Sequence, residues 1–339
     1  MKVLFIGGTG IISSACSQLA VERGIELYLL NRGESKRPAA EGAHILRGDI
    51  RDVESAKSAI QGIAFDAVVD WIAYTPDQVR RDIELFRDRT GQYVFISTAS
   101  VYQTPLVNLP VTESTPLHNP YWQYSRDKIA CENLLMQAYR EHQFPATIVR
   151  PSHTYDRTML PIHGGYTMID RMRKGKPVIV HGDGTSLWTL THHRDFAKAF
   201  VGLLGNLHAR GESFHITSDE ILTWNQINEI LARAAGAQAR LVHVSSDMIA
   251  AYDSEWGDGL LGDKAHSMIF DNTKIKRAVP GYVATIPFTQ GAAEILAWYD
   301  ADPARRVVDP KLDRLVDTII AVYEAVLPKD SRVPRSSET

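Results

Sequence analysis

The chain has 339 residues, of which 44% are hydrophobic and 23% are charged, a composition that excludes a disordered or fibrous protein. This length predicts a main domain with a smaller companion. The formal net charge of −3 argues against nucleic acid as a partner, and the two cysteines, Cys16 and Cys131, indicate no disulfide scaffold.

Short apolar runs alternate with segments of helical period through the first half of the chain. The predicted strands are 2–6, 25–30, 43–47, 66–72, 92–97 and 145–150, and the predicted helices are 13–23, 53–60, 77–89 and a long one from Tyr124 past Tyr139. This alternation is typical of a parallel sheet with helices on both faces. We therefore predict an α/β fold with a Rossmann-type doubly wound parallel sheet.

The alternation loosens after residue 150. A strand at 178–180 precedes a Gly182-Asp183-Gly184 turn, and helices are predicted near 192–204, 224–236 and 311–326. We assign the main domain to 1–155 with a return segment at about 188–225, and a smaller C-terminal substrate-binding lobe to 156–187 and 226–328. Residues 329–339 form a polar tail.

The apolar segments are too short for membrane insertion. Val3-Leu4-Phe5-Ile6 is shorter than the apolar region of a signal peptide, and no run approaches the ~20 residues needed to cross a bilayer. We expect a cytoplasmic protein without membrane contact.

A glycine-rich turn links the first strand to the first helix, in the sequence Gly7-Gly8-Thr9-Gly10-Ile11-Ile12. Gly7 permits the tight turn, and Gly10 lets the backbone approach a pyrophosphate at the positive end of the helix. The usual third glycine is replaced by Ser13, which is small enough for close packing of helix and strand. The turn predicts that the main domain binds NAD, with NADP as an alternative.

The end of the second strand leaves the choice between NAD and NADP open. Asn31 and Arg32 lie where NAD sites commonly carry an acidic residue. Asn31 can bond to a 2′-hydroxyl, whereas Arg32 can stack on adenine or pair with a 2′-phosphate. Asp49, after the third strand, either accepts a bond from the adenine amino group or caps the next helix.

A tyrosine and a lysine four residues apart, Tyr124 and Lys128, share one face of the long helix. A phenol with a reference pKa of about 10 is a poor base, but a nearby ammonium favours the phenolate. Tyr124 can then exchange a proton with a substrate hydroxyl while hydride moves to or from nicotinamide. Thr98, at the end of the fifth strand, is the hydroxyl expected to hold the substrate oxygen.

Over roughly residues 1–300 the sequence resembles the extended short-chain dehydrogenase/reductases, the family of UDP-glucose (UDP-galactose) 4-epimerase and the nucleotide-sugar dehydratases. The resemblance lies in the glycine turn, Gly48-Asp49-Ile50, Ser97-Thr98-Ala99-Ser100-Val101-Tyr102, Tyr124 to Lys128, Arg150-Pro151 and Gly182-Asp183-Gly184. It implies cofactor contacts at Ile11, Ile12, Asn31, Arg32, Asp49, Ile50, Trp71, Ile72, Ala73, Ser97, Lys128 and Ser152. It also implies catalysis by Thr98, Tyr124 and Lys128, and a homodimer formed by the helices at 77–89 and 124–140.

The second half of the site departs from the family pattern. His153 stands where relatives often place a substrate-contacting asparagine, so it is either a substrate ligand or a packed structural histidine. Ala99-Ser100 replaces the acid pair of the dehydratases, which argues against dehydration. Trp188 occupies the place of a diphosphate-binding arginine and is expected to stack on a base or sugar ring. A second arginine before Asp271 is also missing, although Lys264 lies nearby.

Other chemistries lack their sequence patterns. No His-Glu-x-x-His or paired-cysteine motif indicates a metal, and no Gly-x-Ser-x-Gly elbow indicates a hydrolase. The leading hypothesis is an NAD(P)-dependent epimerase of a sugar nucleotide or related sugar, acting through a transient keto intermediate. A net dehydrogenase or reductase of a sugar-type alcohol is the first alternative. Because some relatives similar to chloroplast stem-loop-binding proteins keep this fold with altered sites, a non-catalytic RNA-associated role is the second.

Overall fold

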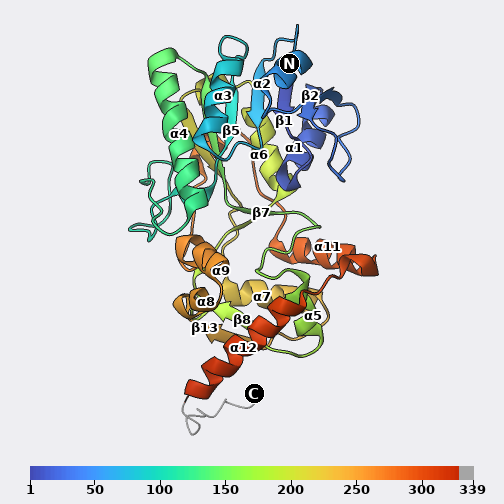
Figure 1. The fold of residues 1–339 in the computed structure, drawn as a ribbon, viewed down its shortest axis with the longest axis vertical. Coiled ribbons are helices and arrows are strands. Elements are labelled where there is room, and N and C mark those ends of the chain that lie inside the picture. The colour runs from blue at the N-terminus through green and yellow to red at the C-terminus, as the bar shows by residue number, and fades with distance from the viewer. Residues whose placement is uncertain (328–339) are drawn as a thin grey trace.

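The computed structural model describes residues 1–327, and the predicted polar tail at 329–339 lies outside the described residues. A central sheet of seven parallel strands, in the order β11-β6-β5-β4-β1-β2-β3, forms one half of the molecule (Figure 1). Its strands are β1 Lys2–Ile6, β2 Glu26–Asn31, β3 His44–Arg47, β4 Ala67–Asp70, β5 Tyr93–Ile96, β6 Ala146–Pro151 and β11 Glu212–Ile216. The predicted Rossmann-type α/β fold is confirmed, with the six expected strands present.

Helices cover both faces of this sheet because successive side chains of a strand point to opposite sides. They are α1 Ile11–Glu22, α2 Val53–Ala59, α3 Pro76–Phe86, η1 Ala99–Val101, α4 Gln123–His142, α6 His193–Leu203 and α10 Thr273–Ala278. Val3 and Phe5 of β1 pack with Phe200 on the α1/α6 face. Leu4 and Ile6 pack in the second core, on the face of α2, α3 and α4. The fully apolar strands therefore reflect burial on both sides.

The strand β11 was not recognised from the sequence, although its stretch was placed in the main domain. Residues 212–216 pair in parallel with 147–151 of β6, which extends the sheet by one strand. Only Phe214, His215 and Ile216 of β11 are buried, so the local apolar signal is short. Paired residues of β11 and β6 are 65 positions apart in the sequence. This long-range pairing, and not the local sequence, therefore makes β11 the edge strand of the sheet.

A smaller lobe, with its own core, lies below the sheet in the view of Figure 1. Its elements are α5 Tyr166–Arg173, β8 Val178–His181, α7 Trp224–Ala234, β13 Leu241–Val244, α8 Ser246–Tyr252, α9 Ser254–Gly259, η3 Leu260–Lys264, α11 Phe288–Asp300, η4 Pro303–Arg305 and α12 Pro310–Val326. The short η2, Leu207–Ala209, belongs to the connection between α6 and β11. The buried Arg171 guanidinium anchors α12 by pairing with Asp313 and Asp317. The assignment of domain boundaries remains a prediction.

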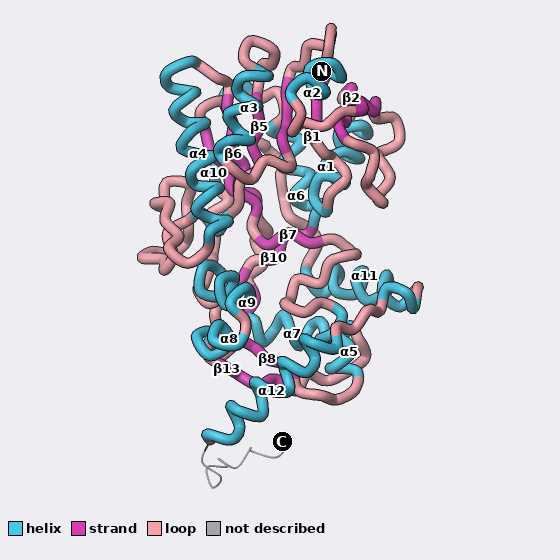
Figure 2. Tube along the Cα trace, viewed as in Figure 1, coloured by secondary structure: helices cyan, strands magenta, loops and turns pink. Residues whose placement is uncertain are grey.

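Two short strand pairs lie outside the central sheet. One joins β7 His153–Tyr155 to β10 Leu190–His192 in parallel, and the other joins β9 Leu187–Trp188 to β12 Leu222–Thr223 in an antiparallel arrangement. Figure 2 shows one of them, β7 with β10, between the sheet and the lobe. Because β7 follows β6 directly, these pairs lie beyond the carboxyl edge of the sheet, where open α/β sheets bind ligands. Among residues 1–327, no helix combines the length and apolar character that a membrane span requires.

Candidate active site

The glycine turn between β1 and α1 adopts a backbone that demands glycine. Gly7 and Gly8 have φ of +99° and +96°, and a Cβ on Gly8 would lie 2.7 Å from Leu29 Cδ2. Ser13 is buried and its hydroxyl accepts a 2.7 Å bond from the Gly10 amide, while Ser17 donates to the Gly8 carbonyl at 2.8 Å. Two serines of α1 thus brace a turn whose bare backbone fits a pyrophosphate at the start of the helix.

A cavity of about 580 Å³ beside this turn fits the adenosine half of a dinucleotide. It is lined by Gly7, Leu30, Asn31, Arg32, Gly33, Glu34, Ser35, Gly48, Asp49, Ile50, Arg51, Ile72, Tyr74 and Gln78. Five predicted cofactor contacts beyond the glycine turn, Asn31, Arg32, Asp49, Ile50 and Ile72, are therefore brought together.

Polar side chains of this cavity already form hydrogen bonds or ion pairs with neighbouring residues. The Arg51 guanidinium donates to both oxygens of Asp49, at 2.9 and 2.7 Å, and holds the pKa of that carboxyl at about 2. Arg32 pairs with Glu34 at 2.7 Å, and the Asn31 side chain accepts a bond from the Gly33 amide. Arg51 and Glu34 were not recognised from the sequence, since nothing in their local pattern distinguishes them from surface charges.

Lys128, from α4, joins the ends of two strands. Its buried ammonium donates to the carbonyls of Ala73 and Ile96, each at 2.7 Å, and lies 4.6 Å from the centroids of the Tyr74 and Phe95 rings. Burial lowers the pKa of Lys128 to about 8. The lysine is therefore held at one position by hydrogen bonds and aromatic faces. Its burial disfavours the charged form of the side chain.

Tyr124 lies on the same helix face, but its electrostatics differ from the sequence-based expectation. Burial raises the pKa of Tyr124 to about 12, Tyr74 adds to the rise, and the Thr98 hydroxyl opposes it. The Lys128 ammonium lies 5.9 Å from the Tyr124 ring centroid and is engaged by two carbonyls. The expectation of a lowered Tyr124 pKa is therefore wrong, because loss of solvent around the buried phenol disfavours the phenolate and raises the pKa.

A chain of hydroxyls orients Thr98. Its Oγ1 lies 3.2 Å from the Ser100 hydroxyl, which in turn lies 2.7 Å from the Ser125 hydroxyl. The Ser100 amide also donates to Thr98 Oγ1 at 3.2 Å. In the sequence Ser100 was informative only as the place of a missing acid, whereas the structure connects it to both Thr98 and the turn of α4 that carries Tyr124.

A second cavity, of about 540 Å³, is lined by Thr98 and Tyr124, and we call it the reaction cavity. Six predicted site residues line it: Ile11, Thr98, Tyr124, Ser152, His153 and Trp188. The cavity also has lining residues that were not predicted as ligands: Tyr74, Trp122, Met159 and Asp263. Lys264, noted in the sequence only as lying near the place of a missing arginine, lines it as well. They come from segments far apart in sequence, so only the fold brings them together.

His153 and Trp188 form one polar unit in this cavity. The Trp188 indole N–H donates to His153 Nδ1 at 3.2 Å. Burial and the nearby Lys264 charge lower the pKa of His153 to about 3, so its imidazole is neutral at pH 7. Because Nδ1 accepts, the proton resides on Nε2, and no hydrogen bond within residues 1–327 engages that nitrogen. His153 thus offers an N–H donor to the cavity.

Several predicted cofactor contacts do not line either cavity with their side chains. The Trp71 ring packs against Phe5 and Phe200, with ring centroids 5.4 and 4.8 Å away. The Ser97 hydroxyl donates to Glu132, and Ala73 is buried with its carbonyl bound by Lys128. The cofactor contacts of six residues that line neither cavity remain predictions: Gly10, Ile12, Trp71, Ala73, Ser97 and Lys128.

Residues 3–217 match the model of the NAD dependent epimerase/dehydratase family. The chain belongs to this family. The predicted resemblance, the enzyme class and the dependence of the family on NAD are thereby confirmed. Within the described residues, no group of three or more His, Cys, Asp or Glu side chains is placed to hold a metal ion.

The proteins that this chain resembles have different activities. It is 27% identical to the chloroplast stem-loop binding protein of 41 kDa b of Arabidopsis thaliana, over 71% of this chain and 65% of that protein. It is 24% identical to 2′-dehydrokanamycin reductase of Streptomyces kanamyceticus, over 83% and 80%. UDP-glucuronic acid 4-epimerase of Bacillus cereus, solved with NAD, matches with a TM-score of 0.70 at 19% identity, over 89% of this chain and 99% of that one. At this identity the structural match shows the shared fold.

Proposed function

We propose that the protein is an NAD(P)-dependent epimerase that inverts a hydroxyl-bearing carbon of a sugar-type substrate through a transient keto intermediate. The observation that carries the proposal is that Thr98 and Tyr124 line one cavity together with Ile11, which follows the glycine turn, while the buried Lys128 ammonium lies 5.9 Å from the Tyr124 ring. An NAD(P) molecule held by that turn through its pyrophosphate would supply the acceptor and then the donor of hydride.

The residues of the chain divide the proton chemistry among them. Thr98, oriented by Ser100, and the Tyr124 hydroxyl hold the carbinol oxygen, and Tyr124 accepts its proton as the carbon is oxidised. Because burial raises the pKa of Tyr124 to about 12, the phenolate needs a nearby positive charge. Lys128 supplies that charge from a position fixed by Ala73 and Ile96, and the proton returns to the oxygen when the ketone is reduced from its other face.

The surroundings of Thr98 support epimerisation over dehydration. Elimination of water needs an acid and a base beside the ketone, but Ala99 and Ser100 are the residues that follow Thr98. In the described part of the chain, Asp263 is the one carboxyl that lines the reaction cavity, and Lys264 lies 3.3 Å from it. The cavity therefore lacks a free acid–base pair of the dehydratase kind.

A net reductase or dehydrogenase is the second candidate, because the same three residues serve it if the cofactor exchanges. The similarity to a 2′-dehydrokanamycin reductase, over 83% of this chain, favours this alternative. For either activity we also propose a homodimer formed by α3 and α4. These two helices pack against each other, and Ile83, Leu134 and Ala138 line a groove between them.

The test is a product assay with purified protein, added NAD or NADP, and a panel of sugar substrates. An epimerase yields an isomer, seen by NMR, with no net change in absorbance at the nicotinamide band. Stoichiometric NAD(P)H would identify the dehydrogenase instead. The matched control is Tyr124→Phe, which should abolish the isomer. Unchanged activity in this variant, together with salt-sensitive RNA binding, would favour the RNA-associated role.

A further inference from the structure

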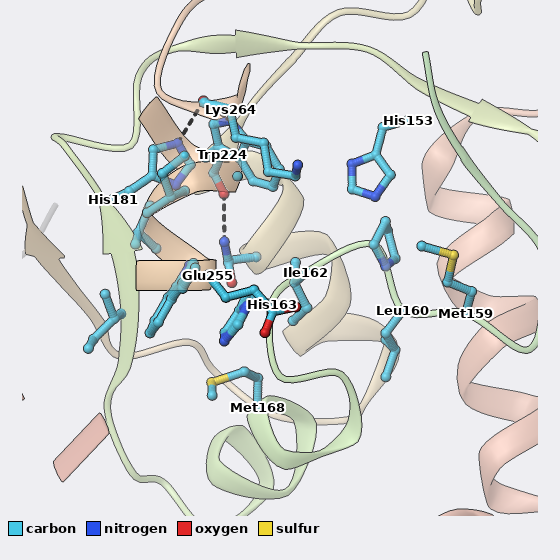
Figure 3. Close-up of a pocket in the computed structure, with 17 residues that line it drawn as sticks. His153, Met159, Leu160, Ile162, His163, Met168, His181, Trp224, Glu255 and Lys264 are labelled. Carbon is cyan, nitrogen blue, oxygen red and sulfur yellow. Dashed lines mark hydrogen bonds between the residues drawn. The ribbon is translucent and has the colours of Figure 1, made fainter. Parts of the chain in front are cut away.

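A third cavity, of about 290 Å³, adjoins the reaction cavity on the side of the lobe. His153, Met159 and Lys264 line both cavities and form the boundary between them. In Figure 3 the Lys264 side chain extends toward His153 across the top of the smaller cavity. A substrate whose reacting carbon lies at Tyr124 can therefore extend past His153 into this second space.

Most residues of the smaller cavity are apolar or aromatic. Its apolar lining consists of Met159, Leu160, Pro161, Ile162, Met168, Ile179, Val180, Trp224, Trp256 and Leu260, and its polar lining of His153, His163, His181, Asn228, Glu255 and Lys264. The His163 ring stacks on Trp256, with centroids 4.1 Å apart and planes 6° from parallel. Burial lowers the pKa of His163, which favours the neutral ring. The cavity suits a flat or weakly polar group.

The charges around both cavities do not suit a diphosphate. Lys264 is the one cationic side chain that lines either cavity in the part of the chain that the structure describes. Its ammonium lies 3.3 Å from Asp263 Oδ2, and Glu255 adds a further carboxyl. Burial lowers the pKa of His181 to about 4 and that of His153 to about 3, so neither imidazole adds positive charge at pH 7.

The low positive charge of both cavities favours a substrate without phosphate over a nucleoside diphosphate. A nucleoside diphosphate brings two negative charges, which are costly to bury unless cations or several N–H donors pair with them. Arginine is the side chain best suited to that pairing, and the lining contains none within residues 1–327. Trp188 stands where the family pattern has an arginine, and its ring is buried against Trp224. Its indole N–H already donates to His153, so it has no further donor for a phosphate.

We propose that the substrate is an unphosphorylated glycoside, an inference that rests on the proposed function. Its reacting sugar ring lies at Thr98 and Tyr124, and its aglycone or second ring enters the aromatic cavity against Trp256. The His153 Nε2–H at the boundary donates to an oxygen of the glycoside. A nucleotide base also has a flat face, but it arrives with a diphosphate that this lining does not neutralise.

The experiment compares phenyl glycosides, methyl glycosides and UDP-sugars of the same hexoses as substrates of the full chain with NAD. Turnover is read as epimer formation by NMR, and binding is read by calorimetry. Because an aromatic stack adds selectivity, the KM of a phenyl glycoside should be about three- to tenfold below that of its methyl analogue. UDP should neither bind measurably nor inhibit at millimolar concentration.

Two tryptophan variants locate the aglycone. Trp256→Leu should remove the preference for phenyl over methyl glycosides, because the KM of the phenyl compound rises to that of its methyl analogue. Trp298→Leu is the matched control, because Trp298 lies on α11, stacks on Arg305 and lines neither cavity. It should leave the preference intact.

The outcomes separate this inference from the proposed function. If UDP-sugars are epimerised in a Tyr124-dependent reaction that UDP inhibits, and Lys264→Ala raises their KM, the proposed function stands and the glycoside inference is wrong. Loss of the phenyl preference in Trp298→Leu but not in Trp256→Leu would also overturn the inference. If no compound of either class is converted or oxidised, the proposed function itself fails.

Discussion

Replacement of Lys128 by methionine tests the electrostatic core of the site. The variant keeps the length of the side chain but removes the ammonium and its two 2.7 Å bonds to the Ala73 and Ile96 carbonyls. Losing a positioned acid–base partner of this kind is worth about 10²- to 10⁴-fold in rate. We expect kcat to fall by at least about 10²-fold, since the Tyr124 phenolate would then form without its stabilising charge.

Stability should change much less than activity, because two effects oppose each other. Two hydrogen bonds from a charged donor contribute roughly 1.5–3 kcal/mol each. The lowering of the Lys128 pKa from 10.5 to about 8 corresponds to roughly 3 kcal/mol that the buried charge costs the folded state. The difference predicts a loss of about 0–3 kcal/mol in the free energy of unfolding, measured by urea denaturation.

The same pKa predicts how the two proteins respond to pH. The folded-state pKa of Lys128 is lowered, so its charge penalises the native state below pH 8, and this penalty disappears as the pH rises from about 8 to 10.5. Activity of the parent enzyme should fall above about pH 8 as Lys128 loses its proton. The methionine variant should lack both effects. A variant that retains activity within a few-fold, with an unchanged alkaline limb, would refute the assigned role of Lys128.

Three further substitutions probe separate parts of the site. Tyr124→Phe should lower kcat by about 10²- to 10⁴-fold in the product assay with little change in thermal stability; a loss confined to KM would contradict proton transfer by the phenol. Gly8→Ala places a Cβ 2.7 Å from Leu29 at a positive φ, and should cost about 1–3 kcal/mol in denaturant unfolding and weaken NAD binding by calorimetry. A tight NAD complex would reject the role of this turn. His153→Phe leaves the buried Trp188 N–H without its acceptor, which should cost about 1–3 kcal/mol, and should raise KM at unchanged NAD affinity. An unchanged KM would mean that His153 is only a packing residue.

Short-range patterns in the sequence were sufficient for much of the main domain. The alternation of apolar strands and helices predicts the parallel sheet because both faces of each strand are buried, as for Val3 and Leu4 in β1. The glycine turn was predictable because backbone conformations such as that of Gly8 exclude other residues. The shared face of Tyr124 and Lys128 follows from a spacing of one helical turn. Each of these conclusions depends on residues close together in the chain.

Features that depend on burial and on distant segments were decided by the tertiary structure. The direction of the Tyr124 pKa shift is set by the removal of solvent around the phenol, which spacing along α4 does not reveal. The bond from Trp188 to His153 joins residues 35 positions apart and determines which imidazole nitrogen carries the proton. Lys264 and Asp263 reach the reaction cavity from a segment more than 130 residues beyond Tyr124. Sequence alone therefore defined the glycine turn and the helix that carries Tyr124 and Lys128. The shape and charge of the proposed substrate space exist only once the lobe packs against the edge of the sheet.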